Sequence, residues 1–140
     1  MGTLTATVQS TNQRMGFLAE IRNMEPIVID YVPPFGDDQG ATPMELLLAA
    51  LGACTSSGVG LLLRKKGRVV SRIEASVTGD RLETHPTVFR SIDVVLSVES
   101  DDVSDEDMAE VLQKAETVLC PVYVMLAKAT EIRVSHRIIK

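Results

Sequence analysis

The chain has 140 residues, which fits a single domain over residues 1–140. Its 45% hydrophobic and 24% charged residues are typical of a globular protein and exclude a disordered chain. A formal net charge of −5 argues against nucleic-acid binding, which needs a basic patch. Residues 1–10 lack a basic start followed by an apolar run, so we expect a cytoplasmic protein in a reducing compartment, where permanent disulfides are disfavoured.

Three short strands are predicted at the start of the chain. The segments Thr3–Val8, Phe17–Ile21 and Ile27–Val32 carry apolar residues at alternate positions, the pattern of a half-buried strand. Two prolines and two glycines between positions 33 and 40 then predict an irregular connection.

A long apolar helix is predicted from Pro43 to Lys66. Thr42 and Glu45 have the spacing of a capping box at its start, and Gly67 suits its end. The 18 uncharged residues Leu46–Leu63 reach the minimum length of a membrane span. Because hydroxyl residues and glycines occupy the centre of this segment, we expect a helix buried within protein and no membrane contact.

The length of this helix predicts a partner. At ~1.5 Å per residue it would run roughly 36 Å, whereas a domain of this size has a radius of gyration of only about 14 Å. One small subunit cannot cover so long an apolar helix. We therefore expect a homodimer in which a second copy buries the remainder.

The second half of the chain predicts two strands, two helices and a final strand. A loop over 79–87 separates the two strands, Ser104 begins an amphipathic helix, and Pro121 interrupts it because proline has no N–H. A shorter helix to about Ala129 and the strand Glu131–Ile139 complete an α+β order, βββ-α-ββ-α-α-β. The expected inward-facing rows are Val69, Ser71, Ile73, Ala75 and Val77; Ile92, Val94, Leu96 and Val98; and Met108, Val111, Leu112, Ala115, Val118 and Leu119.

The two cysteines are the candidate reactive groups, and each has a structural alternative. Cys54 is either a small buried hydrophobic residue or a thiol whose charged form the neighbouring hydroxyls of 55–57 stabilise. Cys120, directly before Pro121, either caps a kink or lies at a helix start that favours a thiolate. Two cysteines 66 positions apart and two histidines do not have zinc-site spacing, so we expect no metal.

Three motifs resemble one family. Thr42-Pro43-Met44-Glu45-Leu46, with Cys54 eleven positions after Pro43, is similar to the opening of the central helix in OsmC/Ohr proteins. Cys120-Pro121 resembles their second cysteine motif, and the segment 85–89 (HPTVF) is similar to the OsmC-like branch. Over essentially the whole chain, the resemblance implies an intertwined homodimer with a long buried central helix. It also implies a thiol-dependent organic hydroperoxide reductase that needs no cofactor and is reset by an external dithiol.

The same resemblance implies roles for individual residues. Cys54 would attack the peroxide and Cys120 would resolve the sulfenic acid as a disulfide. Helix electrostatics alone nominate Cys120 as the attacking thiol, but we favour Cys54 because its apolar surroundings suit an alkyl peroxide. Arg14, in the first strand turn, would hold the thiolate. Arg22 competes for that role, and the structural alternative is that Arg14 is an ordinary surface arginine.

Glu45 departs from the Ohr pattern by one position, since Met44 stands where that branch has its glutamate. Nine residues at ~100° each place Glu45 about 180° from Cys54 on the helix. Glu45 therefore acts either across a dimer or only in the capping box. The shifted position of this glutamate favours the broader OsmC-like branch over the Ohr branch. The alternative function is a non-catalytic dimer that binds a small apolar ligand at the subunit interface.

Overall fold

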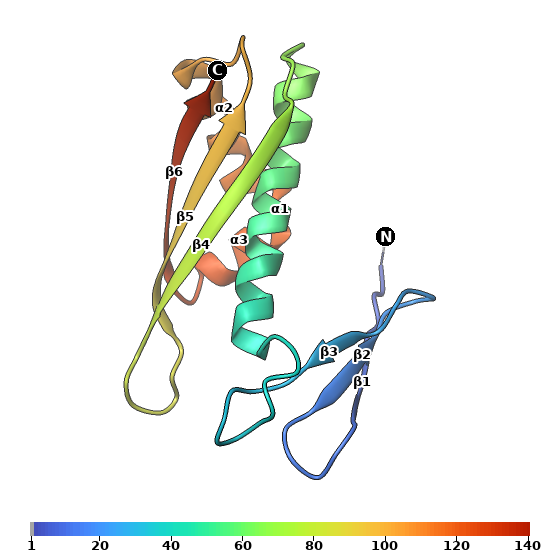
Figure 1. Ribbon diagram of the computed structural model, residues 1–140. Coiled ribbons are helices and arrows are strands. Elements are labelled where there is room, and N and C mark those ends of the chain that lie inside the picture. Colours follow the sequence, from blue (N-terminus) through green and yellow to red (C-terminus); the bar gives the residue numbers. More distant parts are fainter. Residues whose placement is uncertain (1) are drawn as a thin grey trace. The chain divides into compact units, whose positions relative to one another are not determined.

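A computed structural model describes residues 2–140 (Figure 1). The predicted order βββ-α-ββ-α-α-β is confirmed, with one π-helical turn added between the last two helices. The chain divides between Leu47 and Leu48 into two compact units, which are described separately. The elements are β1 Thr7–Ser10, β2 Phe17–Glu20, β3 Ile27–Ile29, α1 Pro43–Lys65, β4 Arg72–Arg81, β5 Phe89–Glu99, α2 Asp105–Lys114, η1 Ala115–Leu119, α3 Pro121–Ala127 and β6 Glu131–Ile139.

The N-terminal unit contains an antiparallel sheet in the order β1-β2-β3. The predicted first strand, Thr3–Val8, is wrong in position: the strand is Thr7–Ser10, and Leu4 is 97% exposed. The turn decides this register, because the Thr11 N–H donates to the Gly16 carbonyl oxygen at 3.0 Å and pairing proceeds outward from there. Since β2 is only four residues long, it offers partners to four residues of β1.

The loop after β3 is built around a buried carboxylate. Asp30 accepts backbone N–H groups from Tyr31 at 2.8 Å, Gln39 at 3.2 Å and Asp37 at 3.3 Å. These bonds, with that from Tyr31 the largest contribution, hold the pKa of Asp30 below its usual value despite desolvation. The predicted strand Ile27–Val32 therefore ends early, at Ile29, because Asp30 already belongs to the loop.

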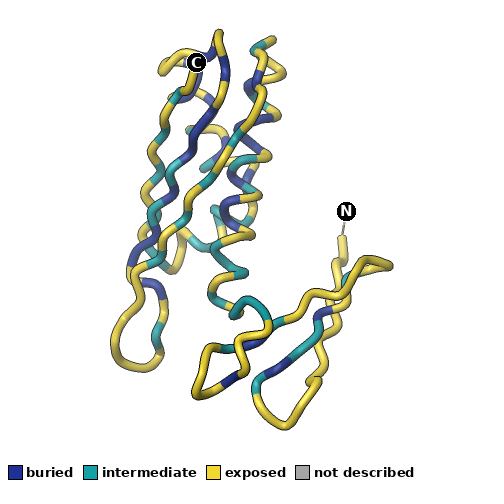
Figure 2. The backbone as a smooth tube through the Cα atoms, viewed as in Figure 1, coloured by how far each residue is buried: buried dark blue, intermediate teal, exposed yellow. Residues whose placement is uncertain are grey.

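The second unit is a three-stranded sheet with β5 in its centre, antiparallel to β4 and parallel to β6. A parallel pair needs a crossover connection, and α2, η1 and α3 supply it. The helices of this unit lie together on one side of the sheet (Figure 1). The predicted β5 row of Ile92, Val94, Leu96 and Val98 is confirmed, and all four side chains are fully buried. The backbone of β5 is accordingly coloured as buried over much of its length in Figure 2.

The predicted inward row of β4 is confirmed only in part. Ile73, Ala75 and Val77 lie on the less exposed face, but Val69 is 69% exposed, and Val70 is buried instead. The strand begins only at Arg72, so the two-residue alternation does not extend back to Val69.

Helix α1 has the predicted boundaries to within one residue. The capping box is confirmed: the Glu45 N–H donates to Thr42 Oγ1 at 3.2 Å, and the Thr42 N–H donates to Glu45 Oε1 at 2.9 Å. At the other end Gly67 has a φ of +84°, a left-handed conformation that glycine adopts without strain. By length and composition alone α1 could cross a membrane.

One face of α1 packs against β4 at close range. A Cβ atom at Gly52 would lie 3.0 Å from Val77, and one at Gly60 would lie 3.1 Å from Ile73. Only 39% of the most apolar 18-residue window is buried within the chain. The long helix is thus confirmed, but in the single chain it is covered on one side rather than all round.

The amphipathic helix α2 begins at Ser104 as predicted, but its inward row is wrong at the end. Met108, Val111 and Ala115 are buried, whereas Val118 is 75% exposed. In the π-helical turn η1 the Cys120 N–H donates to the Ala115 carbonyl at 2.9 Å, five residues back. This wider turn rotates Val118 and Leu119 outward and brings Cys120 to the inner face.

Asp107 anchors the start of α2. Its carboxylate accepts the Ser104 N–H at 3.0 Å and Arg68 Nε at 2.9 Å. These two contacts, the backbone bond first, lower the Asp107 pKa to about 2 from an ordinary value of 3.8.

We expect Asp107 to make stability pH-dependent in acid. A depressed folded-state pKa contributes stability above the unfolded value of 3.8, and this contribution is lost as the pH falls towards about 2. Urea unfolding of the wild type and Asp107→Asn should therefore give free energies that differ at pH 6 and converge near pH 2. A difference in unfolding free energy that does not change with pH would show that the Asp107 charge does not contribute to stability.

Candidate functional site: a cysteine pair

Both cysteines belong to the unit Leu48–Lys140, and both are free thiols. Cys54 lies in the middle of α1 and is partly exposed. Cys120 is the N-cap of α3 and is completely buried. The two thiols lie close enough for Cys120 to raise the pKa of the Cys54 thiol. The structure therefore brings together two predicted site residues that are 66 positions apart in the sequence.

Cys120 lies where two further donors meet its sulfur. The Tyr123 N–H, in the first turn of α3, donates to Cys120 Sγ at 3.4 Å. Thr55 Oγ1 lies 3.7 Å from the same sulfur. The predicted position of Cys120 at a helix start is confirmed, with Pro121 as the first helical residue.

Cys54 has a less favourable environment for ionisation. Burial raises the pKa of its thiol, and the neighbouring Cys120 thiol raises it further. The Val122 backbone N–H acts in the opposite direction and lowers it. Desolvation is the largest of these contributions, so the Cys54 thiol ionises less readily than an ordinary cysteine.

Thr55 was grouped with its neighbours as a possible partner of Cys54, and the structure places it against Cys120 instead. Its hydroxyl is completely buried. Its neighbour Ser57 donates to the Ala53 carbonyl oxygen at 2.7 Å and is exposed. The signal available in the sequence was position: Thr55 is a polar residue in the row formed with Leu51, Val59 and Leu63, the buried stripe of α1.

Arg14 belongs to the N-terminal unit, where its guanidinium is held by the loop after β3. It pairs with the Asp37 carboxylate and donates to the Pro34 carbonyl oxygen at 2.5 Å. Arg22 has a φ of +52° and places Nη2 3.1 Å from the Met24 sulfur. Neither contact shows whether Arg14 or Arg22 holds the Cys54 thiolate. That role stays a prediction for both arginines.

Glu45 uses its carboxylate in the capping box with Thr42, which lowers the pKa of Glu45. It lies nine positions before Cys54 on one continuous helix, so it faces about 180° away. Its capping role is confirmed, and a catalytic role stays a prediction.

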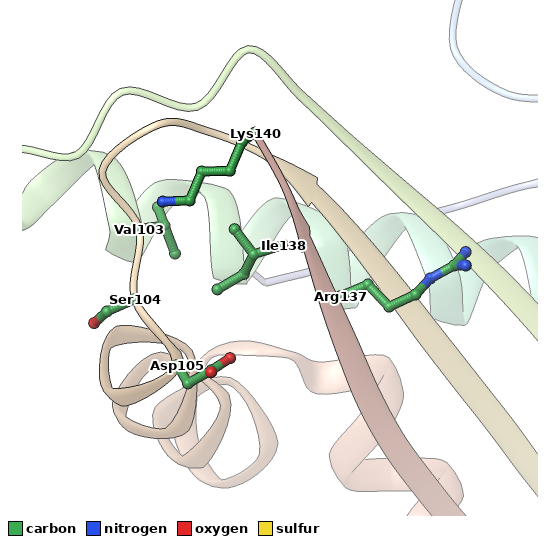
Figure 3. Close-up of a pocket in the computed structure, with 6 residues that line it drawn as sticks. All are labelled: Val103, Ser104, Asp105, Arg137, Ile138 and Lys140. Atoms are coloured by element: carbon green, nitrogen blue, oxygen red, sulfur yellow. The ribbon is translucent and has the colours of Figure 1, made fainter.

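Elsewhere on the second unit, a surface hollow of about 670 Å³ lies beside the start of α2 and the end of β6 (Figure 3). Its polar groups have partners: Ser104 caps α2, and Asp105 bonds His136 at 2.9 Å. Arg137 points away from the hollow and donates to Ser97 (Figure 3). Among residues 2–140, no three His, Cys, Asp or Glu side chains are grouped to hold a metal ion. The cysteine pair is therefore the candidate site.

The fold and this pair define a class: small α+β proteins with one thiol on a long central helix and a second at the start of a later helix. Residues 36–135 match the family described as OsmC-like protein, so the chain belongs to the OsmC family. This match runs across both compact units; a single domain over residues 1–140 stays a prediction.

The sequence is 29% identical to protein YhfA of Escherichia coli (strain K12) over 123 residues, covering 88% of this chain and 90% of that protein. An OsmC-like protein from Mycoplasma pneumoniae superimposes with a TM-score of 0.86 at 20% identity, with 99% of each chain covered. The organic hydroperoxide resistance protein OhrB of Bacillus subtilis does so with a TM-score of 0.64 at 20% identity, covering 95% of this chain and 98% of that one. These two structures share the fold.

We expect Cys120→Ala to lower the pH at which Cys54 ionises. The substitution removes the Cys120 thiol, whose presence raises the Cys54 pKa, and leaves the Val122 N–H, which lowers it, in place. The rate of iodoacetamide labelling at Cys54, followed by peptide mass spectrometry from pH 6 to 10, measures this. Gln113→Ala, on the exposed side of α2, is the control and should keep the wild-type profile. An unchanged profile in Cys120→Ala would show that the two thiols do not interact.

Proposed function

We propose that the protein is a thiol-dependent hydroperoxide reductase that works through Cys54 and Cys120. The observation that carries this proposal is that two free thiols, one on α1 and one at the start of α3, lie close together. A purely structural cysteine has no need of a second thiol in contact. Membership of the OsmC family, which has fold relatives named organic hydroperoxide resistance proteins, supports the same activity.

The reaction needs two sulfurs in succession. The Cys54 thiolate attacks one oxygen of the peroxide, the O–O bond breaks, and the alcohol leaves, so that Cys54 becomes a sulfenic acid. Cys120 then attacks the Cys54 sulfur, a disulfide forms, and water leaves. An external dithiol supplies the two electrons that return both thiols. No metal or organic cofactor enters this sequence of steps.

Access favours Cys54 as the attacking thiol. Cys54 is partly exposed, whereas Cys120 has no exposed surface, so a peroxide reaches Cys54 first. Burial of the resolving sulfur also protects it from over-oxidation, because susceptibility follows exposure.

Arg14 is the residue we propose to hold the Cys54 thiolate, with Arg22 as its competitor. The ion pair of Arg14 with Asp37 is about half exposed on each side. Such a pair is worth about 1 kcal/mol or less, so the guanidinium can exchange Asp37 for another anion. Arg14→Ala should slow the labelling of Cys54 at neutral pH while Arg22→Ala leaves it unchanged; the reverse would assign the role to Arg22. For Glu45 we propose that any catalytic role is exercised across a dimer.

We also propose that the working form is a cytoplasmic homodimer. The residues Ala50, Ala53, Ser57 and Leu61 form an uncharged, exposed row along α1 at spacings of three and four. A helix face of this length and polarity suits a second copy of itself, which would also complete the burial of α1.

The peroxidase proposal is tested with single cysteine variants and a sulfenic-acid trap. We expect Cys120→Ser to consume one equivalent of an alkyl hydroperoxide and to carry the trap on Cys54. Cys54→Ser should consume none. If the trap instead appears on Cys120 in Cys54→Ser, the two roles are exchanged. An inert parent protein, given dithiol reductants and both hydrogen peroxide and an alkyl hydroperoxide, would favour an OsmC-like dimer that binds a small apolar ligand.

The dimer is tested by placing a charge on the exposed row of α1. Leu61→Glu adds an exposed carboxylate in the single chain but buries an unpaired charge in a dimer, which is strongly unfavourable. Sedimentation equilibrium at micromolar concentration should give a wild-type dimer and a Leu61→Glu monomer. Gln113→Glu, on the exposed side of α2, is the matched control and should remain dimeric. A wild-type monomer would refute the proposal.

A further inference from the structure

We propose that the cysteine pair is a redox-sensitive cap on helix α3. As a free thiol, Cys120 holds the first turn of this helix, and when it joins Cys54 in a disulfide it releases that turn. The inference rests on the proposed function only in that the two cysteines form a disulfide. It makes α3, to which the two-cysteine chemistry gives no task, a segment whose order depends on the redox state of the site.

The first observation is how the first turn of α3 is capped. The N–H groups of a first helical turn have no carbonyl partner within their own helix. Pro121 has no N–H, and the Val124 N–H donates to the Cys120 carbonyl oxygen at 3.0 Å. The Tyr123 N–H donates to Cys120 Sγ at 3.4 Å, so the sulfur takes the place that a serine or aspartate oxygen has in other helix caps.

The other free N–H of this turn belongs to Val122. It lies close enough to Cys54 to lower the pKa of that thiol. The first turn of α3 is therefore built against both sulfurs, and a change in their positions acts on it directly.

The second observation is that α3 depends on its cap. It has seven residues, and none of them is buried. Helices this short are marginal by themselves. Helix α2, by contrast, has ten residues, a capping box between Ser104 and Asp107, and the buried side chains Met108 and Val111. Loss of the sulfur cap should therefore loosen α3 and leave α2 unchanged.

The third observation concerns which cysteine moves when the disulfide forms. The two thiols are free, so their sulfurs must approach to bonding distance. Cys54 lies in the middle of the 23-residue helix α1, which packs against β4 and η1. Cys120 lies at the junction of η1 and α3 with an extended backbone, φ −100° and ψ 94°. The junction is the less constrained of the two, so the Cys120 sulfur makes the larger movement and leaves the Tyr123 N–H.

The buried Thr55 hydroxyl, 3.7 Å from Cys120 Sγ, also loses this neighbour. It has a second acceptor in the Leu51 carbonyl oxygen four residues earlier, to which a helical threonine commonly donates. The Tyr123 N–H has no second acceptor within α3, because it belongs to the first turn. The cost of the movement therefore falls on α3.

The covalent step balances. The hydroperoxide converts the Cys54 thiol to a sulfenic acid, and this condenses with the Cys120 thiol: the S–S bond forms, the S–O bond breaks, and water leaves. An external dithiol returns two electrons, becomes a disulfide itself, and restores both thiols and with them the cap.

The change is visible from outside the molecule. Met125 of α3 is 64% exposed, and Val118 of the adjoining turn η1 is 75% exposed. When the first turn of α3 opens more often, this surface changes with it. The dithiol reductant of the proposed cycle therefore meets a different surface on oxidised molecules than on reduced ones.

The test compares reduced wild type with wild type oxidised by diamide, which takes two electrons and two protons from the pair. Mass spectrometry verifies the Cys54–Cys120 disulfide, and NMR follows amide hydrogen exchange of residues 122–127. We expect these amides to exchange roughly fivefold faster after oxidation, the factor that corresponds to the loss of a typical N-cap. The amides of α2 and β5 should be unchanged or slower, because a disulfide constrains the unfolded chain.

Three variants separate capping from other effects of oxidation. Reduced Cys120→Ala should show the same acceleration in α3, which stays formed most of the time but opens more often. Cys120→Ser keeps a capping oxygen and should resemble the reduced wild type. Cys54→Ser treated with diamide forms no disulfide within the chain, so its α3 amides should not change.

Several results would overturn the inference: equal exchange of α3 in both redox states, an acceleration of the same size in α2, no disulfide with diamide, or a folded Cys120→Ala without acceleration. Should Cys120→Ala fail to fold, the oxidised and reduced wild type with Cys54→Ser still decide.

Failure of this inference is distinguishable from failure of the proposed function. If the wild type consumes no peroxide while the diamide disulfide accelerates exchange in α3, the peroxidase function fails and the redox-sensitive cap stands. If peroxide is consumed while exchange in α3 does not respond to oxidation, this inference alone fails.

Discussion

The site depends on one backbone hydrogen bond, from the Cys120 N–H to the Ala115 carbonyl oxygen. It closes a turn over five residues instead of four and so inserts one residue into the face of the helix. Continued as an ordinary α-helix, the same face would run from Ala115 to Val118 and Leu119, and Cys120 would turn away from α1. Pro121 prevents the preceding helix from continuing, because it has no N–H to donate to the preceding turn. It can only begin a new helix.

Small residues on α1 allow its neighbours to come close. Gly52 and Gly60 face β4, and a Cβ atom at Gly58 would lie 3.7 Å from Ala115 and 3.8 Å from Leu119. One side of α1 therefore packs against β4, and the adjacent side packs against the π-helical turn η1. Cys54 and Thr55 lie between these glycines, which is why both reach the start of α3.

The two thiols are differentiated by burial and by the groups around their sulfurs. Cys54 is partly exposed, and desolvation raises the pKa of its thiol. Cys120 is completely buried, and its sulfur lies close to the Thr55 hydroxyl and the Tyr123 N–H. A small molecule that enters from solvent therefore meets Cys54 before Cys120.

What the sequence by itself determined were features that depend on neighbouring residues: the start of α1 through Thr42, Pro43 and Glu45, its end at Gly67, and the last strand Glu131–Ile139. Caps and alternation are local, so they can be read from a few adjacent positions. The family motifs also indicated both cysteines as the candidate reactive groups.

Only the tertiary structure decided which side chains meet. The π-helical turn has no sequence period of its own, so extending the α-helical pattern placed Val118 inward and missed the rotation. Pairing with β2 placed β1 at Thr7–Ser10, because register is set by the turn and the partner strand rather than by one strand's own alternation. The contact of Thr55 with Cys120 joins residues 65 positions apart. Its physical cause is the packing of α1 against a turn whose geometry forms only when the chain folds.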